Sequence, residues 1–332
     1  MHETPDEAAP LMREAIALGE TARRRSSPNP WVGALIVAPD GVVVGSGATE
    51  APGGRHAEIV ALSMAGELAR GATVVCTLEP CAHQGRTGPC TEALVAAGVA
   101  RVIVGVEDPD PQVAGAGIRQ LVAAGIDVVV GVEAAAVSAS LSAYLHHRRT
   151  GRPQVVLKLA ATLDGRTAAP DGSSQWITGP EAREDAHRLR ADADAIVVGA
   201  GTVRADDPSL TARLDPPAER QPQRFVLGAI PEGAACLPAE SLVGPIDAVL
   251  DDLGDRGILQ VLVEGGAGVA KQLVQAGCVD RLVVYLAPAL FGGDDGRPLF
   301  EGAGAATMEG LRRGRFVSVV QVGEDLRVEV EP

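Results

Sequence analysis

Pro80-Cys81-Ala82-His83-Gln84-Gly85-Arg86-Thr87-Gly88-Pro89-Cys90, together with His56-Ala57-Glu58, decides most about the fold and the chemistry of this 332-residue chain. The two stretches supply an imidazole, two thiols and a carboxylate two residues from the imidazole. A zinc ion that activates water takes three protein ligands and keeps a fourth position open, and a carboxylate beside it moves protons. The pattern therefore predicts a zinc site held by His56, Cys81 and Cys90.

The carboxylate of Glu58 is the expected catalytic proton carrier of this site. A His-x-Glu segment followed by Pro-Cys and a second cysteine is typical of zinc-dependent deaminases that act on nucleobases. Their usual signature closes with Cys-x-x-Cys, whereas residues 82–89 separate the two cysteines here. His83 in this loop competes as a ligand, although we assign it to the substrate loop. A fourth protein ligand would instead make the site a structural zinc module that mediates contacts.

The cysteine loop resembles that of the bifunctional pyrimidine deaminase/reductase family of riboflavin biosynthesis. The resemblance covers nearly the whole chain and implies an N-terminal cytidine-deaminase-like α/β/α domain and a C-terminal dihydrofolate-reductase-like α/β domain. Further matching stretches are Pro28-Asn29-Pro30-Trp31-Val32-Gly33, Gln112–Gly115, Leu163–Thr167, Ser174–Thr178, Ala205–Pro208 and Glu264–Gly266.

Composition excludes several other classes of protein. A net charge of −14 argues against a nucleic-acid partner but leaves room for a small phosphorylated substrate in a local basic pocket. Residues 1–10 lack the apolar stretch of a signal peptide, and no apolar run approaches the roughly 20 residues of a membrane span. The odd count of 5 cysteines favours thiols and a metal over disulfides. We expect a cytoplasmic enzyme without a membrane partner, and a homo-oligomer whose size the sequence does not give.

The first half alternates helices and strands, which predicts a sheet between helices. A helix that begins at His56 and another that begins near Cys90 would direct two positive helix ends at one metal site, which favours thiolate ligands. The Asp-Gly turn at residues 39–41 predicts a hairpin. The expected helices are 11–25, 56–69 and 91–97, and the expected strands are 32–38, 42–47, 72–78 and, both buried, 101–106 and 127–132.

A basic, polar stretch at residues 146–153 is the expected linker. We expect it to separate two domains, which by the resemblance are a zinc-dependent deaminase domain (residues 1–148) and an NADPH-dependent reductase domain (residues 153–332). Residues 216–256 show no clear pattern. In the second half the expected strands are 154–161, 195–199, 258–264 and 281–286, followed by an antiparallel pair, 316–322 and 326–330, and the expected helix is 265–275.

Candidate substrate contacts in the first half come from the resemblance. Asn29, between two prolines, is expected to bind the substrate, with a plain turn residue as the alternative. Arg86 and Thr87 are further candidates, with the phosphate as one target. The three remaining cysteines have no partner pattern and are expected in the core; they are Cys76, Cys236 and Cys278.

The second half carries one phosphate-binding candidate that is visible without the resemblance. Residues 264–268, Glu-Gly-Gly-Ala-Gly, follow a strand and open a helix, where backbone N–H groups can cradle a phosphate. A tight strand-to-helix turn explains the same residues equally well. The resemblance implies NADPH contacts at Ala160, Trp176, Thr202, Asp206, Gly266, Ala267 and Gly268. It also implies substrate contacts at Ser174, Arg190, Leu210, Arg213 and Glu264, and assistance to the sugar step by Lys158 and Asp206.

The function that the resemblance implies has two steps. The first is zinc-dependent hydrolytic deamination of 2,5-diamino-6-(5-phosphoribosylamino)pyrimidin-4-one. The second is NADPH-dependent reduction of the ribosyl to a ribityl chain. One alternative is a deaminase whose second domain binds ligand without reducing it, because Gly228-Ala229 stands where many family members have Asp-Ser, on the expected nucleotide-binding edge.

Overall fold

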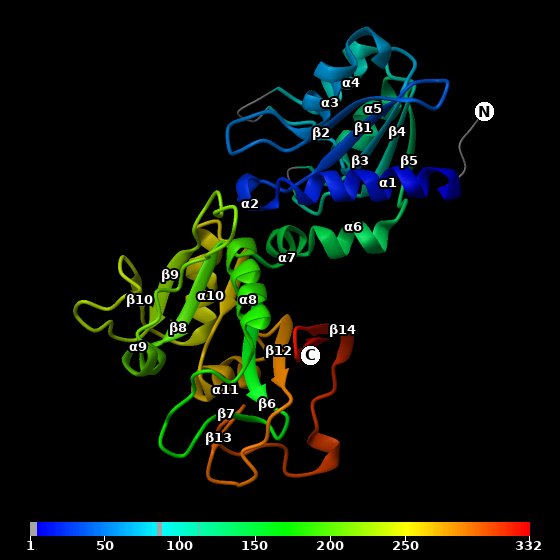
Figure 1. Cartoon of the computed structure of the whole chain (residues 1–332). Helices are drawn as coiled ribbons and strands as arrows, with labels where there is room; N and C mark the ends of the chain where they lie inside the picture. The colour runs from blue at the N-terminus through cyan, green and yellow to red at the C-terminus, as the bar shows by residue number, and fades with distance from the viewer. Residues whose placement is uncertain (1–4, 85–87, 112) are drawn as a thin grey trace. The chain divides into compact units, whose positions relative to one another are not determined.

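The structure, a computed structural model, describes residues 5–84, 88–111 and 113–332 (Figure 1). The chain divides into two compact units, Met1–Thr150 and Gly151–Pro332. No helix in the described ranges is both long and apolar enough to cross a membrane.

In the first unit, the described residues form a five-stranded sheet (Figure 1). Its strands are β1 (Gly33–Val37), β2 (Val43–Ala48), β3 (Thr73–Leu78), β4 (Arg101–Val106) and β5 (Asp127–Val130). They lie in the order β2-β1-β3-β4-β5; β1 is antiparallel to both neighbours, and the other pairs are parallel. The predicted hairpin is confirmed, with Gly41 at φ +86°.

Helices cover both faces of this sheet, so the predicted α/β/α layering is confirmed. They are α1 (Pro5–Glu20), α2 (Arg23–Ser26), α3 (Ala57–Ala65) with η1 (Gly66–Ala69), α4 (Cys90–Ala97), α5 (Ala116–Ala123), α6 (Ala134–Ser140) and α7 (Ser142–Thr150). Helices α1 and α6 pack on one face, and α3, α4 and α5 on the other. Helix α3 lies so close to β2 that a Cβ atom at Gly45 or Gly47 would collide with helix backbone oxygens. This contact fixes the start of α3, where His56 lies.

Three expectations for the first unit are wrong in detail. The helix predicted at residues 11–25 starts earlier and breaks between α1 and α2. The strand predicted as buried at 127–132 is β5, which ends at Val130 and is partly exposed because it lies at the sheet edge. Residues 146–150 of the predicted linker belong to α7, since Tyr144, Leu145 and His147 are buried and its basic last turn suits a helix C-terminus.

In the second unit, an eight-stranded sheet runs through the described residues. Its strands are β6 (Gln154–Thr162), β8 (Ala195–Gly199), β9 (Gln223–Leu227), β10 (Glu240–Leu242), β11 (Gln260–Val263), β12 (Arg281–Ala287), β14 (Arg315–Val322) and β15 (Asp325–Glu331). Their order is β10-β9-β8-β11-β6-β12-β15-β14, parallel up to β12 and antiparallel beyond it. A small separate pair consists of β7 (Arg166–Ala168) and β13 (Arg297–Pro298).

Apolar side chains alternate along β6 and fill two cores. Val155, Leu157 and Leu159 pack with one core, and Val156 with the other. The first core includes residues of α10 (Ile246–Asp255) and α11 (Ala267–Ala276), and the second includes residues of α8 (Pro180–Asp192) and α9 (Ala200–Asp206). Helices therefore lie on both faces of this sheet as well.

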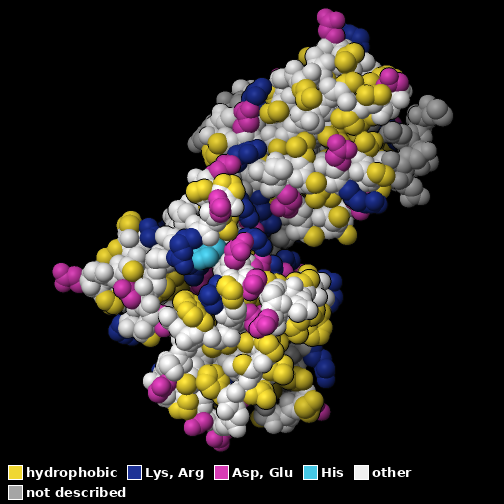
Figure 2. Space-filling view, viewed as in Figure 1, with side chains coloured by type: hydrophobic (Ala, Val, Ile, Leu, Met, Phe, Trp, Pro, Cys, Tyr) yellow, Lys and Arg dark blue, Asp and Glu magenta, His cyan; other side chains and the backbone are white. Residues whose placement is uncertain are grey.

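The segment that gave no clear sequence pattern, residues 216–256, holds β9, β10 and α10. The predicted closing pair is confirmed as β14 and β15. Strand β14 is the last strand of the sheet and leaves Phe316, Val319 and Val320 exposed, and apolar side chains are visible on this part of the unit in Figure 2. A short turn, η2 (Met308–Gly310), precedes β14.

Candidate active sites

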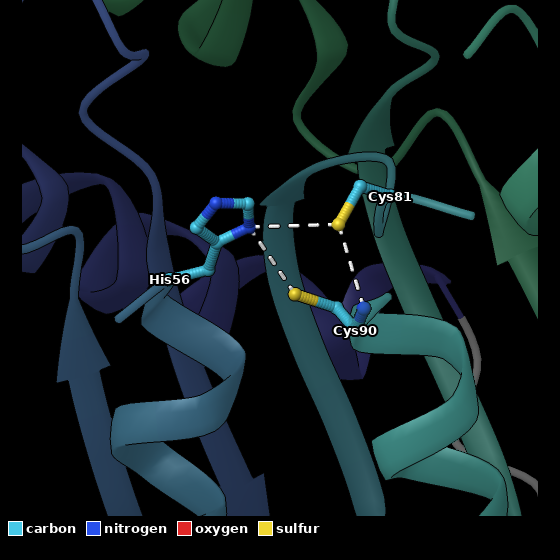
Figure 3. Close-up of side chains that lie close together, drawn as sticks. All are labelled: His56, Cys81 and Cys90. Atoms are coloured by element: carbon cyan, nitrogen blue, oxygen red, sulfur yellow. Dashed lines mark hydrogen bonds between the residues drawn. The ribbon is translucent and has the colours of Figure 1, made fainter. Parts of the chain in front are cut away.

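The three predicted metal ligands converge at two helix starts (Figure 3). His56 is the N-cap residue of α3, Cys90 is the first residue of α4, and Cys81 follows β3. His56 Nδ1 lies 3.5 Å from Cys81 Sγ and 3.3 Å from Cys90 Sγ. The Cys90 backbone N–H also donates to Cys81 Sγ at 3.4 Å.

This donor set fits zinc. One nitrogen and two sulfur atoms lie within 4.8 Å of one another. Zinc bonds of roughly 2.0 Å to nitrogen and 2.3 Å to sulfur, at tetrahedral angles, require N···S separations of about 3.5 Å, close to those observed. Among residues 5–84, 88–111 and 113–332, this cluster has three members and does not include His83. The described residues thus leave a tetrahedral position open, as catalytic zinc sites do.

The protonation states of Cys81, Cys90 and Glu58 depend on one another. The pKa of Cys81 is lowered because the Cys90 thiol donates a hydrogen bond to it, and the same bond raises the pKa of Cys90. Burial raises the pKa of Glu58 to about 6, with the nearby Cys81 charge adding to the effect. A bound cation acts in the opposite direction and favours the carboxylate.

A cavity of about 610 Å³ opens beside these residues. His56, Glu58 and Cys81 line it, and so do the two substrate candidates Asn29 and His83. The Asn29 backbone N–H donates to Ser26 O at 2.9 Å, so this residue serves a turn and faces the cavity at once. Arg86 and Thr87 lie outside the described residues.

The sequence analysis did not predict three acidic residues that line the same cavity, Glu79, Asp108 and Asp110, which we call the acidic wall. Glu79 is buried, and its carboxylate accepts four backbone N–H groups, those of Asp108, Gly115, Gly117 and Ile118, at 2.9–3.2 Å. This carboxylate ties the loop after β4 to the end of β3. Asp108, Asp110, Tyr144 and Arg148 line the cavity beside it. The four donors lie 29–39 residues from Glu79 in sequence, so no local pattern indicated this role.

The remaining cysteines and Trp31 are structural. Cys76 and Cys236 are fully buried, and Cys278 is partly buried and packs against the first core of the second unit. Trp31 is buried, and its indole N–H donates to Ser140 O at 3.2 Å.

A second cavity, of about 760 Å³, lies in the second unit. Gly266 caps α11, and a Cβ atom there would find its nearest atom at 3.8 Å, so the start of the helix is open to a ligand. Gly228, after β9 at φ +103°, also lines the cavity. A dinucleotide phosphate fits this glycine-lined helix start. Nine predicted site residues line the cavity: Lys158, Ala160, Ser174, Thr202, Asp206, Glu264, Gly266, Ala267 and Gly268.

Two charged side chains dominate one wall of this cavity. Glu264 is held by Arg190 of α8 through bonds of 2.6 and 2.7 Å. Lys158 lies with its Nζ 5.7 Å from the ring centre of Tyr285, and burial lowers its pKa, although the charge of Glu264 opposes this. The wall thus holds an ammonium and a carboxylate with little water around them.

Four predicted residues do not line the larger cavity. Arg190 contacts Glu264 instead, and Leu210 is buried. Arg213 is exposed and donates to Ser209 Oγ at 2.9 Å. Trp176 is 69% exposed, stacks with Arg183 at 4.6 Å, and lines a smaller cavity of about 290 Å³ together with Ser174.

Comparison with protein families gives two matches that together span most of the chain. Residues 5–106 match the cytidine and deoxycytidylate deaminase zinc-binding region, and residues 153–328 match the RibD C-terminal domain. The predicted fold classes of both halves are therefore confirmed.

Full-length relatives agree with these matches. The riboflavin biosynthesis protein RibD of Mycobacterium tuberculosis is 46% identical over 97% of this chain and 95% of its own length, and that of Escherichia coli K12 is 41% identical over 95% and 96%. The solved RibD of Acinetobacter baumannii (form 2) superposes with a TM-score of 0.91 at 36% identity, covering 99% of both chains. A Thermotoga maritima structure, a diaminohydroxyphosphoribosylaminopyrimidine deaminase/5-amino-6-(5-phosphoribosylamino)uracil reductase, gives 0.89 at 32% identity over 99% of both chains. The chain belongs to the RibD family of bifunctional deaminase/reductases of riboflavin biosynthesis.

Proposed function

We propose that residues 1–148 deaminate 2,5-diamino-6-(5-phosphoribosylamino)pyrimidin-4-one and that residues 153–332 then reduce the product with NADPH. The observation that carries the first half of this proposal is the buried Glu58 carboxyl beside the His56, Cys81 and Cys90 donor set in one cavity. The similarity to the Thermotoga maritima diaminohydroxyphosphoribosylaminopyrimidine deaminase/reductase supports the choice of substrate.

Glu58 moves the protons of the deamination. A zinc ion held by the three ligands supplies Lewis-acid activation of water near neutral pH. Glu58 accepts a proton from the attacking water and passes it to the ring nitrogen, and a second transfer lets the exocyclic amine leave as ammonia. Water adds one oxygen to the ring carbon and the amine departs, so the reaction is a balanced hydrolysis. Positioned proton transfer of this kind is worth about 10²- to 10⁴-fold in rate.

In the second unit, the cavity wall supports a reduction. The nicotinamide, when bound, supplies a hydride for the sugar carbon C1′. The bond between C1′ and the ring oxygen breaks, and that oxygen takes a proton to give the open ribityl chain. Lys158 is our candidate donor of this proton, and Asp206, which also lines the cavity, is the candidate that assists it. Glu264 orients the sugar, and the Gly266–Gly268 turn receives the cofactor phosphates.

We further propose that the protein is a cytoplasmic homo-oligomer. The exposed apolar side chains of the edge strand β14 favour association, because such an edge invites pairing with another chain. Light scattering of the purified protein tests this: a monomer at micromolar concentration would reject it.

The proposed function is tested by incubating purified, zinc-loaded protein with the diaminopyrimidine phosphate, with and without NADPH, and identifying products by mass. We expect the deaminated ribosyl product without NADPH and the ribityl product with it. Deamination without any consumption of NADPH would favour the alternative, a second unit that binds ligand without reducing it.

A further inference from the structure

Arg148 is a charged residue of the deaminase cavity to which the mechanism above gives no role. Helix α7 places it one turn after Tyr144, so both side chains lie on one face of the helix. The Tyr144 hydroxyl donates to Asp108 Oδ2 at 3.0 Å, and Arg148 Nε lies 3.7 Å from Asp110 Oδ2. The guanidinium also lies 5.2 Å from the Tyr144 ring centre. Two helix residues thus face two acidic residues across the cavity lining.

The two acidic residues contact α7 in different ways. Asp108 is buried and accepts both the Tyr144 hydroxyl and the Asp110 backbone N–H, the latter at 2.9 Å. The ion pair of Asp110 with Arg148 is longer than a hydrogen bond, and its side chains are 22% and 31% exposed. Partly exposed pairs of this length contribute little stability, so the guanidinium can exchange its partner at small cost.

Arg148 also supplies positive charge to a cavity lining that is otherwise acidic. The cavity lining includes the carboxyl groups of Glu58, Glu79, Asp108 and Asp110, which would repel a phosphorylated substrate. Among the lining residues that the structure describes, Arg148 is the one arginine or lysine. A guanidinium binds phosphate through two parallel charge-assisted hydrogen bonds.

We propose that Arg148 binds the substrate phosphate in the deaminase cavity, leaving Asp110 when the substrate enters, and so makes the deaminase select phosphorylated substrate. This inference rests on the proposed deaminase function. It makes Arg148 a specificity residue, because it contacts the phosphate and not the reacting ring.

The test compares kcat/KM for deamination of the phosphorylated substrate and of the same compound after phosphatase treatment. The variants are Arg148→Gln, Arg148→Lys and, as a matched control, Arg149→Gln, whose side chain is exposed and does not line the cavity. Loss of hydrogen bonds to a charged group, about 1.5–3 kcal/mol, predicts a fall of about ten- to hundredfold for Arg148→Gln with the phosphorylated form. The dephosphorylated form should react as with wild type. Arg148→Lys should be intermediate, since it keeps the charge but loses the two-pronged geometry, and Arg149→Gln should match wild type.

Two results would overturn the inference while leaving the deaminase intact. If Arg148→Gln slows both substrates equally, the residue only supports the wall; if it slows neither, the phosphate is bound elsewhere. A wild-type protein that deaminates neither compound would instead remove the proposed function, and this inference with it.

Discussion

Arg190 donates hydrogen bonds to both carboxylate oxygens of Glu264, with Nε–Oε1 and Nη2–Oε2 distances of 2.6 and 2.7 Å. Its remaining nitrogen, Nη1, donates to Thr211 O at 3.1 Å. The resemblance implies a substrate contact at Arg190, whereas in this structure its guanidinium contacts Glu264 and Thr211. We interpret Arg190 as a positioning residue that acts on the reductase cavity through Glu264.

Replacing Arg190 should weaken both the fold and the reductase. The two side chains are only 13% and 12% exposed, so Arg190→Met leaves a carboxylate without its partner in a nearly dry site. We expect a loss of about 3 kcal/mol in the stability of the second unit and a rise in KM for the reductase substrate, with deamination retained. Thermal unfolding and separate assays of the two reactions measure these effects. The control is Arg188→Met on the same helix, whose half-exposed side chain pairs with Glu184 and lies 3.8 Å from Asp185, and for which we expect a much smaller loss.

Zinc should bind in a ratio of about one per chain and depend on both thiols. Cys81→Ser and Cys90→Ser each remove a thiolate ligand, and we expect the zinc content measured by elemental analysis to fall severely in each. Cys278→Ser is the control, since that residue lies outside the metal cluster. Full zinc occupancy in both ligand variants would show that the ligands are assigned incorrectly.

The pH dependence of reduction should reveal Lys158. Burial lowers its pKa below the usual 10.5, so the protonated form that donates to the sugar oxygen is lost at a lower pH than for an exposed lysine. The reduction rate should therefore fall on the alkaline side below pH 10.5, and Lys158→Met should lack this limb. The free energy of unfolding changes with pH in the opposite direction. The reason is that Lys158 keeps its proton to a higher pH in the unfolded chain than in the folded chain. The contribution of Lys158 to stability thus increases with pH between its folded and unfolded pKa values. A profile that is unchanged in the variant would exclude Lys158 as the donor.

A side chain at the start of α11 should interfere with the cofactor alone. Gly266 has an ordinary φ of −68°, and an added Cβ would meet its nearest atom, Thr202 Oγ1, at 3.8 Å, so Gly266→Ala should fold normally. The methyl group enters the space where we place the phosphates, and we expect KM for NADPH to rise about tenfold while deamination is unaffected. Gly304→Ala, in open space away from the cavity, is the control. Equal KM values in the two variants would move the cofactor phosphates away from this turn.

The metal site was predictable because each ligand lies in a short local pattern. The His-x-Glu pair begins a helix, and the Pro-Cys pairs bracket a loop between a strand and a helix. The packing of α3 against β2 then brings His56 to the two cysteines. The aliphatic strands were readable for the same reason. The structure of residues 216–256 could not be predicted in this way. Strands β9 and β10 are short and lie at the sheet edge, and they are stabilised by pairing with other strands, which a local sequence pattern does not show.

The acidic wall and the Arg190–Glu264 pair depend on contacts across the chain. The hydrogen bond between Tyr144 and Asp108 forms because α7 packs beside the loop after β4. No sequence pattern near either residue predicts this contact. The end of α7 was misread as linker because its charged residues look like a solvated stretch, while the apolar face that holds it is only a few residues long.

The central claim, two separate active sites on one chain, is tested most directly by exchanging one carboxylate in each. Glu58→Gln keeps the metal ligands but removes the proton carrier, and Asp206→Asn changes the reductase cavity alone. Ammonia release from the diaminopyrimidine phosphate and NADPH oxidation with pre-deaminated substrate are measured for both variants. We predict that Glu58→Gln loses about two to four orders of magnitude in ammonia release with normal NADPH oxidation, and that Asp206→Asn does the reverse. Loss of both reactions in a folded Glu58→Gln protein would contradict the two-site account.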